Sequence, residues 1–434
     1  KMEFKKLDNL FDKLFPILRS ITGEGYRKSL KILDKHFKFK YFKYASGSKV
    51  FDWVVPKEWV IKEAYIKFKN KKIIDIKNNN LHVVNYSSNI DKTMKLSELQ
   101  KNLFSLKKNK NVIPYVTSYY KKFWGFCLEE NKRKKLKKGS YKVYINSKFK
   151  NGHVVNGLSK IRGRKKNIVL LTSYLCHPSM ANNELSGPLT LLGLYEKIKK
   201  WKRKNFTYYF LINPETIGSL CFLSNHHKIL KNLLHSGMVL TCLGGFQNKL
   251  SYKKSRNANS SLDRIFDYYS KKKKYNIRNF DPREGSDERQ YSSGELNLPV
   301  GQIARTVYND YSEYHSSGDN KKFMKISKVL KSVEEIEKVL KINDYMFPLE
   351  RNIKYGELQL GKRGLYPNVN FNQNRDKNSS DNLMDNREQL DILMATLSYA
   401  DGKHDILDIA IKLNLDLEKF PKIIDLAIQK KLIK

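Results

Sequence analysis

The feature that most constrains the fold is a regular alternation of apolar and amphipathic runs after residue 165. The apolar runs have the length of strands and are rich in β-branched and aromatic residues, and the runs between them have helical periodicity. We expect strands at 166–175, 206–215, 236–244 and 299–308, with helices at 187–201 and 261–273. This order is typical of an α/β domain built on an open, mostly parallel sheet.

The regions before and after this block have different patterns, which divides the chain into parts. Residues 1–45 show helical periodicity, whereas the chain from about 50 to 160 shows short alternating runs separated by Lys, Asn and Gly turns. The last 45 residues read as three short helices with turns at "DGKHD" and "LNLD", the pattern of a winged helix-turn-helix. We therefore expect an α/β domain at 1–50 and 160–365, an inserted mostly-β module at 51–159, an Asn-rich linker at 366–386 and a winged helix at 387–434.

Charge and cysteine content bear on partners and location. The formal net charge is +41, from 84 Lys+Arg against 43 Asp+Glu, and the lysines are spread along the whole chain. This even spread indicates lysines that face solvent in a chain rich in Lys and Asn. It is less typical of a surface that binds nucleic acid. The four cysteines form no CxxC pair, and no apolar run approaches the length of a membrane span. We expect a cytoplasmic protein with free thiols and no membrane partner.

Three candidate ligands follow expected strands. His177 comes after the first strand, Glu215 after the second, and His315 after the last. Loops at the carboxyl ends of strands in an open α/β sheet meet at one edge, where such proteins bind their ligands. A single loop histidine is usually structural, but two imidazoles and a carboxylate at one edge are the ingredients of a zinc site.

Four motifs make the interpretation more specific. They are "CHPSMANNELSGP" at 176–188, "INPETIGS" at 212–219, "EGSDERQY" at 284–291 and "EYHSSGD" at 313–319. In this order and spacing they resemble the aminopeptidase-like family of bacterial surface-polysaccharide gene clusters, a distant branch of the co-catalytic zinc aminopeptidases. Segments such as "FDWVVPKEW", "NLHVVNYS" and "GKRGLYP" extend the resemblance over nearly the whole chain. It implies a zinc-aminopeptidase-like open mixed sheet flanked by helices, with an inserted small β domain and a C-terminal winged helix.

Carried over residue by residue, the resemblance implies an incomplete two-metal centre. His177 stands at the first histidine ligand, but Asn183 occupies the place of the carboxylate that bridges both metals. An amide offers one neutral oxygen and is a poor zinc ligand, and the neighbouring Glu184 is the nearest replacement. Thr241 lies where a further acidic ligand is expected. The resemblance therefore predicts one zinc rather than two.

The remaining ligands and the general base also follow from the resemblance. Glu215 matches the glutamate ligand and His315 the final histidine, which leaves His177, Glu215 and His315, with Asn183 as a weak fourth ligand. Pro214 replaces the glutamate that serves as general base. Three protein ligands with an open position define a catalytic zinc that activates a bound water.

The loop "GSDERQY" is the expected source of the missing base. Asp287 and Glu288 are the candidate catalytic residues, and Arg289 and Arg305 are the candidates for binding a substrate carboxylate or sugar acid through paired hydrogen bonds. The structural alternative is an ion-pair network among Asp287, Glu288, Arg289 and Arg256, in which the motif shapes the loop instead of reacting.

Two functional interpretations remain open at this stage. One is a zinc-dependent hydrolase of amide bonds that acts on a peptide-like, aminoacyl or amino-sugar substrate in surface-polysaccharide biosynthesis. The other is a catalytically inactive binding protein that keeps the aminopeptidase fold. The last helix of the winged helix carries lysines but no arginine, so a protein contact is favoured there over DNA binding. The scissile bond and the oligomeric state are not legible from the sequence.

Overall fold

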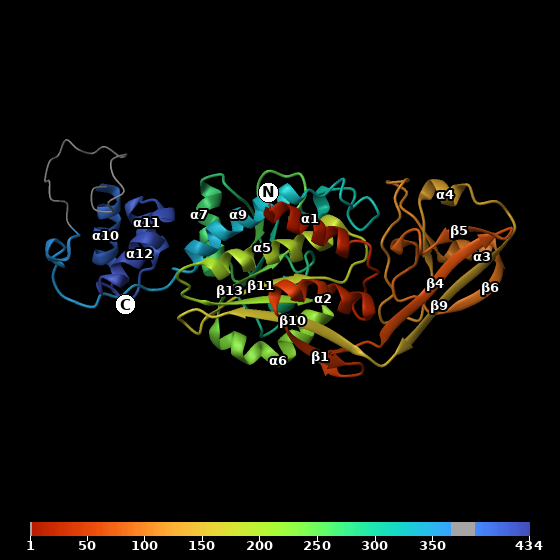
Figure 1. Cartoon of the computed structure of the whole chain (residues 1–434), viewed down its shortest axis with the longest axis horizontal. Coiled ribbons are helices and arrows are strands. Elements are labelled where there is room, and N and C mark those ends of the chain that lie inside the picture. The colour runs from red at the N-terminus through yellow and green to blue at the C-terminus, as the bar shows by residue number, and fades with distance from the viewer. Residues whose placement is uncertain (1, 366–386) are drawn as a thin grey trace. The chain divides into compact units, whose positions relative to one another are not determined.

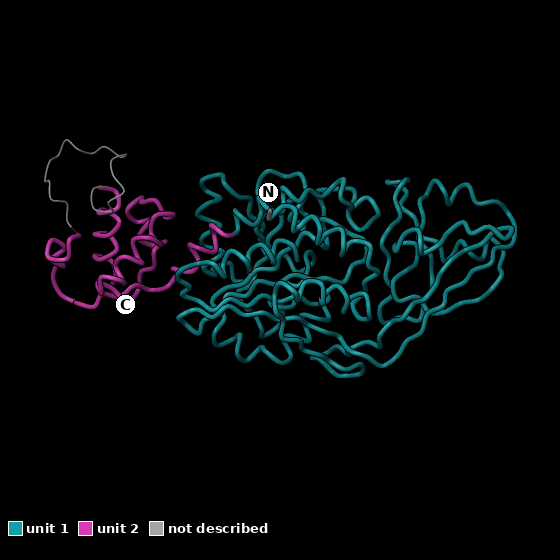
Figure 2. Tube along the Cα trace, viewed as in Figure 1, with its two compact units in different colours: residues 1–336 teal, residues 337–434 magenta. Residues whose placement is uncertain are grey.

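The computed structural model describes residues 2–365 and 387–434. The chain divides into two compact units, Lys1–Ile336 and Glu337–Lys434 (Figure 2). The linker predicted at 366–386 lies outside the described residues, so its nature stays a prediction.

An eight-stranded sheet forms the centre of the first unit. Its order is β1-β10-β12-β11-β13-β16-β14-β15. The middle strands β12, β11, β13 and β16 run parallel, and β1, β10 and β14 add antiparallel pairs at the two sides. The strands are β1 Lys40–Ala45, β10 His153–Ile161, β11 Ile168–Tyr174, β12 Thr207–Asn213, β13 Leu234–Leu240, β14 Ser251–Lys253, β15 Asn276–Arg278 and β16 Val300–Ala304. The open, mixed α/β sheet predicted from the sequence is confirmed.

Helices cover both faces of this sheet, and the sequence explains why its centre is buried. Every residue of β11 is buried, as expected for a central parallel strand whose two faces are both covered. In Figure 1, α5 (Ser186–Lys200) and α6 (Ile217–Leu233) lie on opposite sides of the strands. The other α-helices of this unit are α1 Met2–Leu14, α2 Glu24–Phe37, α3 Leu96–Leu99, α4 Glu130–Lys134, α7 Ser261–Lys271 and α8 Glu288–Tyr291, and α9 Ile326–Asn343 spans the division between the units. At Gly193, α5 and α9 approach so closely that a Cβ atom would lie 2.7 Å from Val333.

A second, smaller sheet is built by the chain between β1 and β10. It has the antiparallel order β5-β4-β9-β6, with β4 Glu58–Phe68, β5 Lys71–Asp75, β6 Ile90–Lys95 and β9 Ser140–Lys150. Alternate residues of β4 and β9, including Ala64, Ile66, Val143 and Ile145, are buried in its core. The mostly-β character predicted for this region is therefore confirmed. Residue 159, where we placed the end of the module, falls within β10 of the large sheet.

A bidentate salt bridge connects this smaller sheet to the helical layer. Arg27 of α2 donates from Nη1 to Glu58 Oε2 at 2.7 Å and from Nη2 to Oε1 at 2.9 Å. Glu58 begins β4 and is only 2% exposed. A two-point Arg–carboxylate contact is both strong and directional, so it fixes the start of β4 against α2.

The second unit contains the three terminal helices expected from the sequence. These are α10 Arg387–Tyr399, α11 Ile406–Leu413 and α12 Phe420–Gln429. Asp405 caps α11 through the backbone N–H groups of Leu407 and Asp408, and Asn414 ends that helix in the left-handed conformation. The winged-helix prediction is confirmed. In the described part of the chain, we find no helix with the length and apolar character needed to cross a membrane.

Candidate metal and substrate site

A cavity of about 330 Å³ lies beyond the carboxyl ends of β11 and β12, the two strands that His177 and Glu215 follow. The three strongest metal candidates from the sequence, His177, Glu215 and His315, all line it. The other lining residues are Ile21, Trp53, Tyr115, Thr117, Tyr119, Tyr120, Cys176, Thr216 and Ile217. Several of these belong to the segment between β1 and β10, so the cavity is shared between the large sheet and the inserted region.

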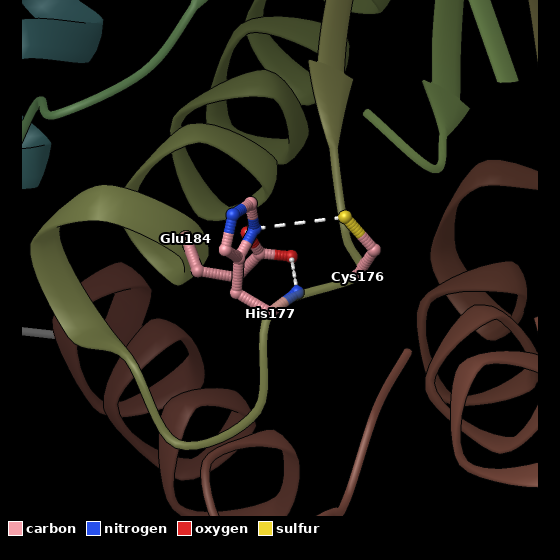
Figure 3. A group of neighbouring side chains, drawn as sticks. All are labelled: Cys176, His177 and Glu184. Atoms are coloured by element: carbon pink, nitrogen blue, oxygen red, sulfur yellow. Dashed lines mark hydrogen bonds and ion pairs between the residues drawn. The ribbon is translucent and has the colours of Figure 1, made fainter. Parts of the chain in front are cut away.

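His177 is held in one orientation by Glu184. The Nδ1 atom of His177 lies 2.5 Å from Glu184 Oε2, and the backbone N–H of His177 donates to Glu184 Oε1 at 3.0 Å (Figure 3). The Nε2 atom, on the other side of the ring, lies 3.4 Å from Glu215 Oε2. Burial by itself lowers the pKa of His177, but the neighbouring Cys176 and Glu184 raise it above the ordinary value. Because Glu184 contacts Nδ1, Nε2 is the ring nitrogen that faces Glu215.

The turn before α5 brings Glu184 to His177. Residues Ala181–Leu185 form one turn of π-helix, a wide turn that is rare and often occurs at functional sites. The carboxylate of Asp319 accepts the backbone N–H of Asn182 at 2.6 Å and that of Asn183 at 2.8 Å. This carboxylate satisfies donors at the start of a helix, which have no partner within the helix itself.

Glu215 is fixed by residues from the "EGSDERQY" motif. Ser286 Oγ donates to Glu215 Oε1 at 2.8 Å, and Asp287 accepts the backbone N–H of the next residue, Thr216, at 2.6 Å. Thr216 has a φ of 62°, a left-handed conformation that costs energy in a β-branched residue and that its surroundings must maintain. Burial raises the pKa of Glu215, and His177 opposes that rise.

His315 lies in the loop after β16 and also has a left-handed backbone, with a φ of 51°. Its carbonyl accepts the N–H of Tyr115 at 2.8 Å, and its ring stacks on Tyr314 with centroids 3.9 Å apart. The ring centroids of His315 and His177 are 5.3 Å apart. Burial and the neighbouring His177 lower the pKa of His315 to about 3. The ring is therefore neutral over a wide pH range, which is the form that binds metals.

Asn183 lies in a group of neutral polar residues. Its Nδ2 donates to Tyr174 Oη at 3.2 Å, and that same Oη lies 2.5 Å from Thr241 Oγ1. Thr241 Oγ1 in turn donates to the backbone carbonyl of Asn183 at 3.2 Å. The Oδ1 atom of Asn183 is buried without a hydrogen-bond partner among the described residues. Where the resemblance implies two acidic ligands, the chain thus places an amide, a hydroxyl and a phenol.

Asp287 and Glu288 are completely buried and do not line the cavity. Asp287 accepts hydrogen bonds from Asn213 Nδ2 at 2.8 Å and from Thr216 N at 2.6 Å, and burial together with nearby Glu215 raises its pKa to about 7. Glu288 pairs with buried Lys253, with Nζ 3.0 Å from Oε1. Asp287 therefore contacts the cavity wall through its hydrogen bond to Thr216, whereas the charge of Glu288 is paired with that of Lys253. Neither carboxylate pairs with Arg256, as the ion-pair network considered from the sequence would require. Arg256 instead donates to the backbone carbonyls of residues 292 and 294.

The two predicted substrate-binding arginines do not line the cavity either. Arg305 is 1% exposed, and its Nε donates to Ser332 Oγ at 2.9 Å while its Nη2 pairs with Glu335. Its Nη1 donates to the carbonyl of Asn248 at 2.9 Å. Arg289 donates from Nε to the carbonyl of Ser286 at 3.3 Å. These contacts give both arginines roles in holding loops together.

A second possible ligand group overlaps the first. Cys176, His177 and Glu184 offer a thiol, an imidazole nitrogen and a carboxylate oxygen within 4.8 Å of one another. Burial raises the pKa of Cys176 to about 11, so the thiol is protonated near neutral pH, and it is the thiolate that binds metals. Glu184 and Cys176 also approach the same nitrogen, Nδ1, as Figure 3 shows for the sulfur. We therefore infer that Cys176 and Glu184 orient the ring of His177 and do not form a separate metal site with it.

Four functional neighbours lay outside the sequence-based assignments. Glu184 was considered only as a substitute metal ligand, and Ser286 and Asp319 were parts of quoted motifs without a role. Tyr115 belongs to "IPYVTSYY" in the inserted region, and its ring centroid lies 5.0 Å from that of His177. Glu184 contacts His177 within one motif, whereas the contacts of the other three residues join segments far apart in the chain, so membership in a motif was the only signal that pointed to these residues.

Comparison with known proteins identifies the family. Residues 8–345 match the family model described as a domain of unknown function, DUF4910, and residues 348–434 match a winged helix-turn-helix model. A protein of Clostridium acetobutylicum named "Putative polysaccharide biosynthesis protein with aminopeptidase-like domain" is 40% identical over 437 residues, covering 98% of this chain and 95% of its own.

Solved structures agree in fold. The crystal structure of a protein from Clostridium acetobutylicum called a "putative peptidase" superposes with a TM-score of 0.86 at 36% identity, covering 99% of this chain and 96% of that one. The zinc aminopeptidase BSAP of Bacillus subtilis gives a TM-score of 0.57 at 12% identity, covering 78% of this chain and 93% of its own. A peptidase M28 precursor of Shewanella amazonensis gives 0.56 at 10% identity, covering 82% and 95%. The last two show likeness of fold alone. The chain belongs to the DUF4910 family of aminopeptidase-like proteins, with a C-terminal winged helix.

Proposed function

We propose that this protein is a zinc-dependent hydrolase of amide bonds whose single metal ion is held by His177, Glu215 and His315. The observation that carries the proposal is the convergence of these residues on one cavity, with His177 Nε2 3.4 Å from Glu215 Oε2. Two imidazoles and one carboxylate are a common ligand set of catalytic zinc.

The residues also fit a zinc ion in their chemistry. The carboxylate of Glu184 on His177 Nδ1 is the partner that metal-binding histidines commonly have, because it fixes the ring and leaves Nε2 for the metal. The low pKa of His315 keeps its ring neutral and able to bind. When bound, zinc would supply a water of lowered pKa and would polarise a substrate carbonyl.

A second zinc has too few anionic ligands in the proposed site. Asn183, Tyr174 and Thr241 hydrogen-bond one another and carry no negative charge near neutral pH. Without a bridging carboxylate, a second cation lacks both charge compensation and geometry. The Oδ1 atom of Asn183 has no hydrogen-bond partner among the described residues, but Asn183 is not among the residues that line the cavity.

Asp287 is the stronger of the two predicted candidates for general base. Its pKa is raised to about 7, which suits proton transfer near neutral pH, and it contacts the backbone of Thr216 in the cavity wall. Glu288 is held in an ion pair with Lys253. Reaching a bound water from Asp287 requires a relay or a movement of the 286–289 loop, so the assignment remains part of the proposal.

The biological setting proposed here is surface-polysaccharide biosynthesis, and the name of the Clostridium relative supports it. The substrate class is a small molecule with an amide bond, either aminoacyl or amino-sugar in character. The competing proposal is an inactive binding protein. It is favoured by the side-chain partners of Asn183 among the described residues, Tyr174 and Cys242, neither of which is a carboxylate. A protein-binding role for the winged helix also stays a prediction, since such domains contact nucleic acid as well as protein.

Metal content decides between the two proposals. We expect about one zinc per chain in protein purified without chelator, measured by plasma mass spectrometry, and a loss of binding of about 100-fold in both His177→Ala and His315→Ala. Glu288→Gln changes a buried carboxylate outside the cavity lining, so it is the control and should keep its zinc. Protein that takes up no zinc on titration, or variants that bind it like the parent, would overturn the proposal in favour of the inactive binding protein.

A further inference from the structure

Two exposed aromatic side chains stand in the wall of the cavity. Trp53 is 39% exposed and Tyr120 is 52% exposed, which is a large exposed fraction for aromatic rings of this size. Their ring centroids are 5.7 Å apart at an interplanar angle of 74°. Trp53 comes from the short hairpin of β2 (Lys49–Val50) and β3 (Trp53–Val54), and Tyr120 has a left-handed φ of 65°. The inserted region thus presents two partly exposed aromatic rings next to the proposed metal ligands.

Trp53 also lines a second cavity, of about 500 Å³. The hairpin residues Phe51 and Asp52 line this second cavity together with Lys231 of α6 and with Gln290 and Glu295. Trp53 is therefore shared by an aromatic cavity that contains the proposed metal ligands and by a neighbouring one, which is lined by polar and charged groups and by apolar side chains such as Leu220 and Leu296. Trp53 is the one residue that the linings of the two cavities have in common.

The charges of the first cavity restrict what can bind there. The chain has 84 lysines and arginines, yet none is among the residues that line this cavity. A substrate carboxylate or phosphate would find no lysine or arginine there as a partner, and desolvating a charge without such a partner is costly. Apart from the proposed metal ligands, the lining residues offer aromatic faces, hydroxyl groups and a thiol.

We propose that Trp53 and Tyr120 form a carbohydrate-binding platform, and that the substrate is a neutral N-acylated amino-sugar glycan spanning both cavities. One face of a pyranose ring consists of C–H groups that pack on an aromatic face, while its hydroxyl rim takes hydrogen bonds from polar groups such as those of the second cavity. The proposal deepens the proposed function, since the acyl amide of one sugar would lie at the His177, Glu215 and His315 site. A dipeptide fits less well, because no lysine or arginine lines the first cavity to pair with its terminal carboxylate.

Sugar binding can be tested without the metal. The probe is N,N′-diacetylchitobiose, titrated by calorimetry into full-length protein kept metal-free with EDTA. We expect a dissociation constant of about 1 mM in the parent, a loss of about tenfold in Trp53→Ala and of about fivefold in Tyr120→Ala, as expected for lost aromatic packing. Trp53→Phe keeps a ring and should bind within about threefold of the parent.

The matched control is Phe246→Ala, which removes another exposed ring (55% exposed) outside both cavities and should leave binding unchanged. Circular dichroism and melting curves verify that each variant is folded. The platform is overturned if the parent shows no binding of the probe at about 20 mM, or if Trp53→Ala binds like the parent. A parent that binds the dipeptide Leu-Gly more tightly than the sugar would overturn it in favour of a peptide substrate. Because these titrations contain no zinc, failure of the zinc experiment would leave the platform standing, and the reverse also holds.

Discussion

Replacing Glu184 with glutamine tests the proposed orientation of His177 most directly. One carboxylate accepts two hydrogen bonds from the same residue, at Oε2 from the ring nitrogen Nδ1 (2.5 Å) and at Oε1 from the backbone N–H (3.0 Å). An amide has one acceptor and one donor, so it cannot accept both. If its oxygen stays with the backbone, its NH₂ faces Nδ1, and the ring must move its proton to Nε2, the atom that faces Glu215. That tautomer cannot bind a metal at Nε2.

The size of the effect follows from these contacts. We expect Glu184→Gln to weaken zinc binding by about 10–100-fold, the usual cost of losing the partner of a ligating histidine. The free energy of unfolding of the metal-free protein should fall by about 2 kcal/mol, since a hydrogen bond to a buried charged acceptor is lost. Competition against a zinc-binding dye measures the first, and urea unfolding in EDTA measures the second.

Asp263→Asn is the matched control. Asp263 is equally buried, lies outside the cavity lining, and accepts hydrogen bonds from the backbone N–H groups of Ser255 and Ser260. It should lose stability but keep its zinc affinity. A Glu184→Gln protein whose zinc affinity stays within about twofold of the parent would refute the argument that this carboxylate selects the tautomer of His177.

Three further predictions follow from particular contacts. Asn183→Asp should raise zinc affinity by about tenfold in isothermal titration because it adds an anionic ligand; equal affinities, or two tightly bound zinc ions in the unmodified protein, would show that position 183 is not the former bridge. Glu58→Gln should lower the free energy of unfolding by about 2 kcal/mol, read from urea titration, because it breaks the paired contact with Arg27. Arg305→Lys should destabilise the fold by about 2 kcal/mol, since lysine cannot satisfy the acceptors at Ser332 and Glu335 together; loss of chitobiose binding with unchanged stability would instead support the substrate-binding role predicted from the sequence.

Local pattern was sufficient to predict the central elements of the fold. A run such as that of β11 is apolar throughout because both faces of a central parallel strand are covered, and helices such as α5 and α7 have their own periodicity, so their identity is encoded in consecutive residues. The positions of His177 and Glu215 after neighbouring strands followed from the same logic, because the carboxyl ends of parallel strands share one edge.

Only the tertiary structure decided which side chains face the cavity. Arg305 and Glu288 have the composition of site residues, yet the chain buries them against Glu335 and Lys253, partners 30 and 35 positions away. In the same way, Trp53 reaches a cavity whose metal candidates lie more than 100 residues later. The physical reason is that a local pattern specifies an element and its apolar face, whereas the direction of one polar side chain depends on charges and hydrogen-bond partners supplied by distant segments.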